Sequence, residues 1–220
     1  MKKTLIPALL ASALLATLPS LSFAQPTQAA AAATQSAAGK TVLDASSRIL
    51  ATLQQRRAEF SKNPAALRSY IDSELNRTFD RDYAARLVLG PNARGASDAD
   101  VKLFADAMAD NLMQRYGSAL LTIQGNPTFQ FKNETPLPGG RGVKVMTELK
   151  RSGSETTPVE YMMRNVNGQW KIFDVTIEGI SYVQTFRTQF DAPLRQKGIK
   201  QVAADLRSGS MQAGPAGNGK

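Results

Sequence analysis

The sequence predicts an α+β domain in which N-terminal helices are followed by a four-stranded antiparallel sheet and then by C-terminal helices. Apolar residues recur at three- and four-residue steps from about 42 to 123, which is the helical period. From 129 to 177 they alternate with polar residues, and a helical period returns from 180 to 206. Helices and strands segregated along a chain in this way are typical of an α+β fold.

Capping residues mark where the helices of the first half begin. Thr41-x-x-Asp44 resembles a capping box, so the first helix is expected to start at Thr41. Asn63-Pro64 combines a cap residue with a proline at the first helical position. The other expected caps are Asp80, before a short helix that stops at Gly90, and Ser97, before a helix reaching about Ile123.

Four runs of alternating residues predict the strands of an antiparallel meander. Asn167-Gly168 is a strong two-residue hairpin signal between the last two strands. In the last strand the apolar phase slips between Ile172 and Phe173, which predicts a β-bulge. The glycine-rich segment 139–142 precedes no helix, so it is interpreted as a hairpin connection and not as a phosphate-binding loop. Two helices are expected to close the chain, from Ile180 to about 194 and from 199 to 206.

The two ends of the chain are expected to lie outside the domain. Residues 1–24 have the form of a secretory signal peptide, with two lysines, an apolar stretch and small residues before the cleavage point, and this form suggests export to a bacterial periplasm. A retained anchor helix is the alternative. Residues 25–40 and 208–220 are rich in small and polar residues and are expected to be a disordered leader and tail. The single domain is then 41–207.

Composition excludes several classes of active site. The chain has no Cys and no His, so cysteine nucleophiles, iron–sulfur clusters and the Ser-His-Asp triad are absent. The carboxylates Asp80, Asp98 and Asp100 fit helix starts, and Ser181 fits a cap better than a nucleophile. We therefore expect no enzyme activity, no cofactor and no metal. The net charge of +9 points to lipid headgroups or acidic partner proteins outside the cytoplasm, unless it only provides solubility.

One segment resembles a known family. Residues 168–190, GQWKIFDVTIEGISYVQTFRTQF, resemble the signature of the MlaC family, also called the toluene-tolerance auxiliary proteins. Phe79-Asp80 with 85–90 and the segment 116–120 resemble two shorter family motifs, and the resemblance covers about 42–206. Many members carry a Trp shortly after the Leu-Gly pair, but 91–94 has none here.

The resemblance implies a periplasmic carrier that binds a glycerophospholipid by its acyl chains, with no nucleic-acid partner. The implied partners are an outer-membrane lipoprotein–porin complex and an inner-membrane ABC transporter that includes a hexameric ring protein. Such a carrier would maintain the lipid asymmetry of the outer membrane. The implied cavity lies between the helices and the sheet, with the headgroup near its opening and the phospholipid as cargo.

A carrier of this kind needs a dry interior. Each methylene buried is worth roughly 0.8 kcal/mol, so two acyl chains require an apolar cavity toward the upper end of the usual range, ~1,000 Å³. The candidate lipid-binding residues are the apolar side chains on inward phases, and ordinary core packing is the alternative for each of them. They are Leu87, Phe104, Met108, Leu112, Val145, Tyr161, Met163, Phe173, Val175, Tyr182 and Phe186.

Two other functions fit the same pattern less well. An enzyme on a similar α+β fold would need a polar cavity with a carboxylate of shifted pKa. An adaptor that binds envelope complexes through a basic surface would need no cavity. We also expect Asp174 or Glu178 to pair with Arg187 and so to fix the last strand to the helix after it.

Overall fold

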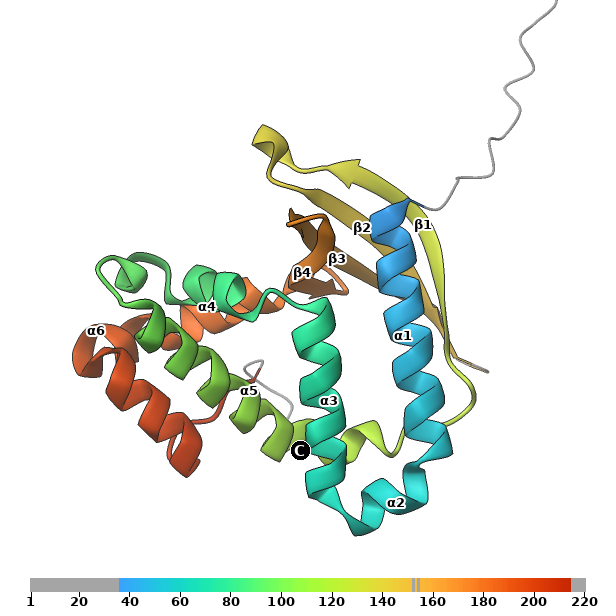
Figure 1. Ribbon diagram of the computed structural model, residues 1–220, viewed down its shortest axis with the longest axis horizontal. Helices are drawn as coiled ribbons and strands as arrows, with labels where there is room; N and C mark the ends of the chain where they lie inside the picture. Colours follow the sequence, from blue (N-terminus) through green and yellow to red (C-terminus); the bar gives the residue numbers. More distant parts are fainter. Residues whose placement is uncertain (1–35, 152, 154, 215–220) are drawn as a thin grey trace, which may run out of the picture. The chain divides into compact units, whose positions relative to one another are not determined.

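The computed structural model describes residues 36–151, 153 and 155–214. The expected signal peptide, most of the expected leader and the last six residues lie outside the described residues. Within them the order of elements is helices, antiparallel sheet and C-terminal helix, so the α+β class is confirmed (Figure 1). No helix in this part of the chain is long and apolar enough to cross a membrane.

Helix α1 (Ala37–Gln55) begins before Thr41, so the expected start at a capping box is wrong. Its cap is Ser36, whose Oγ accepts a hydrogen bond from the Gly39 amide at 2.9 Å. A Cβ atom on Gly39 would lie only 2.7 Å from Cε2 of Phe131 in the sheet. Small residues here let the helix approach the sheet closely, and the same residues made this segment look like part of a loose leader.

Three of the other helices of the first half begin where the caps predict, whereas a short helix that begins at Arg57 has no side-chain cap and was not predicted. Asn63, Asp80 and Ser97 each accept a hydrogen bond from a backbone amide in the first turn that follows. The 3₁₀ turn η1 (Gly90–Ala93) follows the helix that Asp80 caps. The elements are α2 (Arg57–Lys62), α3 (Pro64–Thr78), α4 (Arg81–Leu89) and α5 (Asp98–Leu120).

The sheet is a meander in the order β1-β2-β3-β4-β5, all antiparallel. The expected four strands are present, and a fifth of two residues follows them. Met162 pairs with Asp174 and Met163 with Ile172, which leaves Phe173 as the extra residue of the predicted bulge. The strands are β1 (Thr128–Pro136), β2 (Val143–Lys150), β3 (Thr157–Val166), β4 (Gln169–Ile177) and β5 (Ile180–Ser181), with a 3₁₀ turn η2 (Pro138–Gly140) in the first hairpin.

Helix α6 (Tyr182–Ser208) follows directly from β5. Ser181 caps it, with its Oγ accepting a hydrogen bond from the Gln184 amide at 3.0 Å. The backbone of Gly198 leaves the helical region, with φ 76° and ψ 170°. The two helices that the sequence predicts are therefore the two halves of this kinked element.

Three clusters of buried apolar residues form the core. The α4–α6 cluster joins α4, α5 and α6, and includes Val88, Leu89, Phe104, Phe186 and Phe190. The sheet cluster lies under α1, which runs along one face of the strands in Figure 1, and includes Val42, Val145, Tyr161, Met163 and Ile172. The α1–α3 cluster consists of Leu53, Phe60, Leu67 and Ile71.

The beginning of the expected disordered tail is part of the core. Asn111, which is buried in α5, donates hydrogen bonds to the carbonyl oxygens of Leu206 and Met211, at 2.7 and 3.0 Å. Its side-chain oxygen accepts one from the Ala213 amide at 2.8 Å. Ala213 is completely buried. Asn111 therefore holds residues 209–214 against α5, and Gln189 of α6 adds hydrogen bonds to the Gln212 carbonyl and from the Gly214 amide. Composition alone gave no sign of this anchoring.

Asn111→Ala should destabilise the domain because it leaves a backbone amide and two carbonyl groups without their partner. We expect a loss of about 2–3 kcal/mol, or a melting temperature lower by roughly 4–12 °C, measured by circular dichroism. A chain that ends at Ser208 should lose at least as much, because it also removes the hydrogen bonds of Gln189 with Gln212 and Gly214. Combining both changes should cost less than the sum of the two, because both remove the hydrogen bonds of Asn111 with Met211 and Ala213. Full additivity would show that Asn111 does not act through the tail.

Candidate functional site

An apolar cavity of about 460 Å³ lies where the three clusters meet without closing. It is bounded by α3, α4, α5, β4 and the first turns of α6. Its volume lies within the range of small-molecule sites, ~300–1,000 Å³, but is about half of the volume that we expected from the sequence. The lining residues are Leu75, Phe79, Arg81, Ala84, Val88, Ala105, Met108, Ala109, Leu112, Met113, Tyr116, Gly117, Leu120, Phe173, Asp174, Val175, Ile177, Tyr182, Val183 and Phe186.

Helix α5 supplies two parallel rows of side chains to this cavity. Residues four apart lie above one another on a helix face. The large row is Met108, Leu112, Tyr116 and Leu120, and the small row is Ala105, Ala109 and Gly117, with Met113 in its line. The small row leaves the space and the large row makes it apolar. Sequence reasoning found part of the large row and missed the small one, although the four-residue spacing of the small residues is visible in the sequence.

Six of the eleven candidate residues line the cavity: Met108, Leu112, Phe173, Val175, Tyr182 and Phe186. The other five lie elsewhere. Val145, Tyr161 and Met163 belong to the sheet cluster, on the predicted face of the sheet, but α1 covers that part of the face. Phe104 is buried between α5 and α6, with its ring edge-on to Phe190 at 5.6 Å. Leu87 lies on α4 but does not line the cavity with Ala84 and Val88.

Tyr161 shows why α1 excludes the middle strands from the cavity. Its side chain is 8% exposed, and its hydroxyl forms hydrogen bonds with Ser46 on α1 and Thr147 on β2. Burial raises the pKa of Tyr161, and the two hydrogen bonds oppose that rise only in part. Tyr161 thus joins the helix to the sheet, and its side chain does not line the cavity.

The bulge in β4 brings Phe173 to the cavity wall. Its ring packs edge-on against Tyr83 of α4, with 5.2 Å between ring centroids. The Arg164 guanidinium lies 4.1 Å from the centroid of the Tyr83 ring, and its Nε is 2.6 Å from the Asp80 carboxylate that caps α4. This arrangement attaches the start of α4 to the sheet and fixes one side of the cavity.

Asp174 fixes the opposite side, but not through the partner that the sequence suggested. Its carboxylate accepts hydrogen bonds from the Ser181 hydroxyl at 2.6 Å and from the Val183 amide at 3.0 Å. The expected pairing with Arg187 is therefore wrong for Asp174. Glu178 lies in the turn before β5, with a positive φ of 51°, and is exposed. A charged acceptor at a helix N-terminus is favourable, so Asp174 holds the first turn of α6 against β4.

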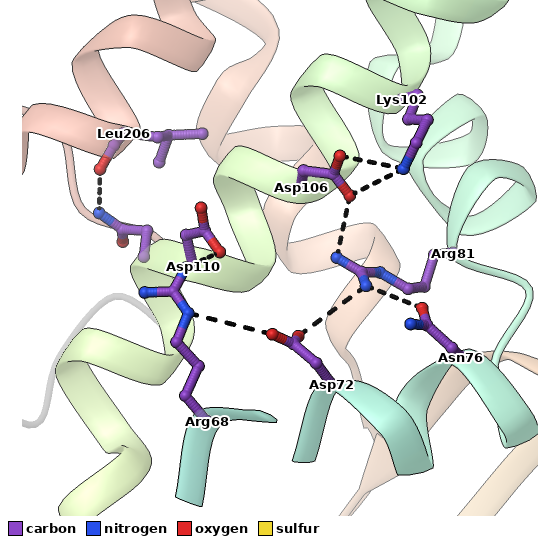
Figure 2. Close-up of polar contacts among 9 residues, drawn as sticks. Arg68, Asp72, Asn76, Arg81, Lys102, Asp106, Asp110 and Leu206 are labelled. Carbon is purple, nitrogen blue, oxygen red and sulfur yellow. Dashed lines mark hydrogen bonds and ion pairs between the residues drawn. The ribbon is translucent and has the colours of Figure 1, made fainter. Parts of the chain in front are cut away.

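A polar network borders the cavity at Arg81 (Figure 2). Arg81 donates a hydrogen bond to Asn76 on α3 at 2.9 Å, and lies 3.9 Å from Asp72 and 3.2 Å from Asp106 on α5. Arg68 extends the network from α3 to Asp110 on α5. Because these charges are shared and partly buried, they tie α3 to α5 more firmly than an isolated exposed pair would.

A polar hollow of about 320 Å³ lies beside this network and shares Phe79 and Arg81 with the apolar cavity. Its other lining residues are Asn76, Asp80, Asp82, Lys102, Asp106, Arg164, Val166 and Lys171. The two spaces place an apolar compartment next to a compartment that carries both signs of charge. Among the described residues no group of three or more acidic side chains could hold a metal ion.

The fold and the site define an α+β domain built around an apolar cavity of ligand size. The family model described as MlaC protein matches residues 43–208. The chain belongs to the MlaC family, as its C-terminal signature suggested.

Named relatives and one solved structure agree with this assignment. The chain is 26% identical to the toluene tolerance protein ttg2D of Pseudomonas putida, over 68% of this chain and 69% of that protein. It is 20% identical to the intermembrane phospholipid transport system binding protein MlaC of Haemophilus influenzae, over 76% and 79%. A phospholipid-binding protein from Ralstonia solanacearum, solved in complex with a phospholipid, shares the fold with a TM-score of 0.69 at 20% identity, covering 79% of this chain and 98% of that chain.

Asp174→Ala should loosen the junction between β4 and α6. Loss of a charged hydrogen-bond acceptor at a helix N-terminus costs about 1–2 kcal/mol, so we expect a melting temperature lower by roughly 2–8 °C. Asp191→Ala is the matched control, because Asp191 pairs with Arg195 one turn along α6 and joins no other element among the described residues. Equal melting temperatures for the two variants would show that Asp174 does not hold this junction.

Proposed function

We propose that this protein is a periplasmic carrier that binds a glycerophospholipid by its acyl chains, without catalytic activity. The observation that carries the proposal is the apolar cavity of about 460 Å³, walled by side chains from three separate clusters. The phospholipid in the names of the Haemophilus and Ralstonia relatives supports the choice of ligand. The signal-like residues 1–24 support the choice of compartment.

The cavity has the capacity for one long acyl chain. A dry protein cavity of about 150 Å³ accommodates benzene, which corresponds to roughly 25 Å³ for each carbon. A volume of about 460 Å³ therefore accommodates roughly 18 carbons. Burying such a chain is worth roughly 14 kcal/mol relative to water, at about 0.8 kcal/mol for each methylene.

The free energy of burying the acyl chain explains why a lipid needs a carrier to cross water and how the carrier can release it. A lipid does not cross water unaided against a cost of that size. The carrier's interior and the bilayer are both apolar, so transfer between them is nearly balanced and proceeds in either direction. Flexible Met108 and Met113 suit a wall that adapts to different chains.

We infer that the headgroup lies in the polar hollow beside Arg81. That hollow adjoins the apolar cavity and offers Arg81, Lys102 and Lys171 near a phosphate, with acidic groups near a positively charged headgroup. The lipid would then lie across the boundary between the two spaces, as it does across the surface of a bilayer.

The resemblance supports a shuttle between an outer-membrane lipoprotein–porin complex and an inner-membrane ABC transporter with a hexameric ring protein. The net charge is +9 for the whole chain and +7 without residues 1–24, which hold Lys2 and Lys3 and no acidic residue, and it would favour docking on acidic partner surfaces. A non-carrier adaptor would use the same charge, but it would have no use for the cavity. Lipid occupancy therefore separates the two functions.

Native mass spectrometry of the protein purified from cells tests the proposal. We expect a bound phospholipid on the wild-type chain. Ala109→Phe should remove most of it, because the phenyl ring fills the cavity from the small row of α5. Its melting temperature should not fall, since a ring that fills an apolar void does not cost stability.

Ala119→Phe is the matched control, because Ala119 is exposed on the same helix and lines no part of the cavity. It should retain wild-type lipid occupancy. Wild-type protein that carries no phospholipid, or an Ala109→Phe variant that carries as much as the control, would overturn the proposal.

A further inference from the structure

A second hollow, of about 410 Å³, lies beside α2, the start of α3 and the end of α5. Its walls are largely apolar, with Phe60 and Leu67 from the α1–α3 cluster and Leu121 just after α5. Polar residues also contribute, including Arg68 and Ser118. The proposed function makes no use of this space.

The hollow and the first cavity adjoin the same stretch of α5. Met113 and Gly117 line both spaces, and no other residue does. A Cβ atom on Gly117 would lie 3.0 Å from Cε of Met113, so the methionine side chain rests on the bare backbone of the glycine. Glycine weakens a helix interior, and the close approach of Met113 gives a packing reason for it here. Met113 therefore lies at the boundary of the two spaces, and its flexible thioether can rotate without moving the backbone.

The volumes match the two chains of a diacyl lipid. The first cavity accommodates roughly 18 carbons, which is one chain, and the second hollow is of similar size. A glycerophospholipid has two chains, so the first cavity alone leaves half of its acyl carbons without an apolar environment. Together the two spaces reach the upper part of the ~300–1,000 Å³ range.

We propose that the hollow between α2, α3 and α5 is a second acyl-chain subsite, joined to the first when the Met113 side chain rotates. This inference rests on the proposed function, because it takes the ligand to be a glycerophospholipid. It goes further in assigning half of the acyl volume to residues around Phe60 and Leu67, and in giving Met113 and Gly117 the role of the passage between the two halves.

The test compares a two-chain and a one-chain lipid on a variant that fills only the hollow. Ser118→Phe places a ring in the hollow from an exposed position on α5, and Ala119→Phe, one residue further on, is the control. The probes are dipalmitoylphosphatidylglycerol in vesicles and monomeric 1-palmitoyl-lysophosphatidylglycerol. Binding of each is measured by native mass spectrometry.

We expect Ser118→Phe to bind the two-chain probe at least about tenfold more weakly than the control, which is the effect of returning two methylenes to water. Binding of the one-chain probe should stay within about twofold of the control. Ala65→Phe, which enters the hollow from α3, should give the same pattern. Circular dichroism melting shows that each variant is folded, and either of the two variants suffices.

The outcomes separate this inference from the proposed function. If the wild-type chain binds both probes and folded Ser118→Phe or Ala65→Phe binds the two-chain probe as tightly as Ala119→Phe, the subsite is overturned and the carrier function stands. If the wild-type chain binds neither probe, the carrier function fails and the subsite fails with it. Selective loss of the two-chain probe supports both.

Discussion

The structure depends on keeping three apolar clusters from closing on one another. Protein interiors normally pack to crystal-like density, so a space of about 460 Å³ persists only when its walls are held from outside. Asp174 holds the start of α6, Asp80 and Arg164 hold α4, and the charges around Arg81 tie α3 to α5. Arg81 and Asp174 line the cavity itself, and Asp80 and Arg164 line the polar hollow beside it. The polar groups therefore determine the shape of the apolar space.

Different side chains of helix α5 have different roles around the cavity. Its large row lines the cavity with apolar side chains. Its small row, Ala105, Ala109 and Gly117, has short side chains or none and so leaves space in the cavity. Its buried Asn111 faces away and attaches the chain after α6. One helix thus provides the apolar wall of the cavity, the space beside that wall and the hydrogen bonds that hold the chain after α6. The helix lies within the region that matches the MlaC family.

Local signals in the sequence predicted much of the fold. Alternation predicted the strands and the bulge at Phe173, and the caps at Asn63, Asp80, Ser97 and Ser181 are confirmed. The start of α1 and the anchored segment 209–214 were missed because Ala, Gly and Ser carry little hydrophobic signal, although Ala38 and Ala213 are almost completely buried.

The residues that line the cavity were harder to predict, because whether a side chain lines a cavity depends on which other elements pack against it. Alternation placed Val145 and Tyr161 on the correct face of the sheet, but only the position of α1 decides that this part of the face is covered. Phe104 and Met108 lie on one helix, and only the approach of α6 separates a core residue from a lining residue. Periodicity predicts which face of a helix or strand a residue lies on. Which other element packs against that face depends on the tertiary structure.

The size of the cavity also bears on folding. A rigid void costs about 24 cal/mol for each Å³, so a dry space of about 460 Å³ would cost roughly 11 kcal/mol. That is comparable to the whole net stability of a typical domain, ~5–15 kcal/mol. Whatever occupies the space therefore acts as a removable part of the hydrophobic core. An apolar ligand that fills the space would thus raise the stability of the domain, and its release would lower that stability again.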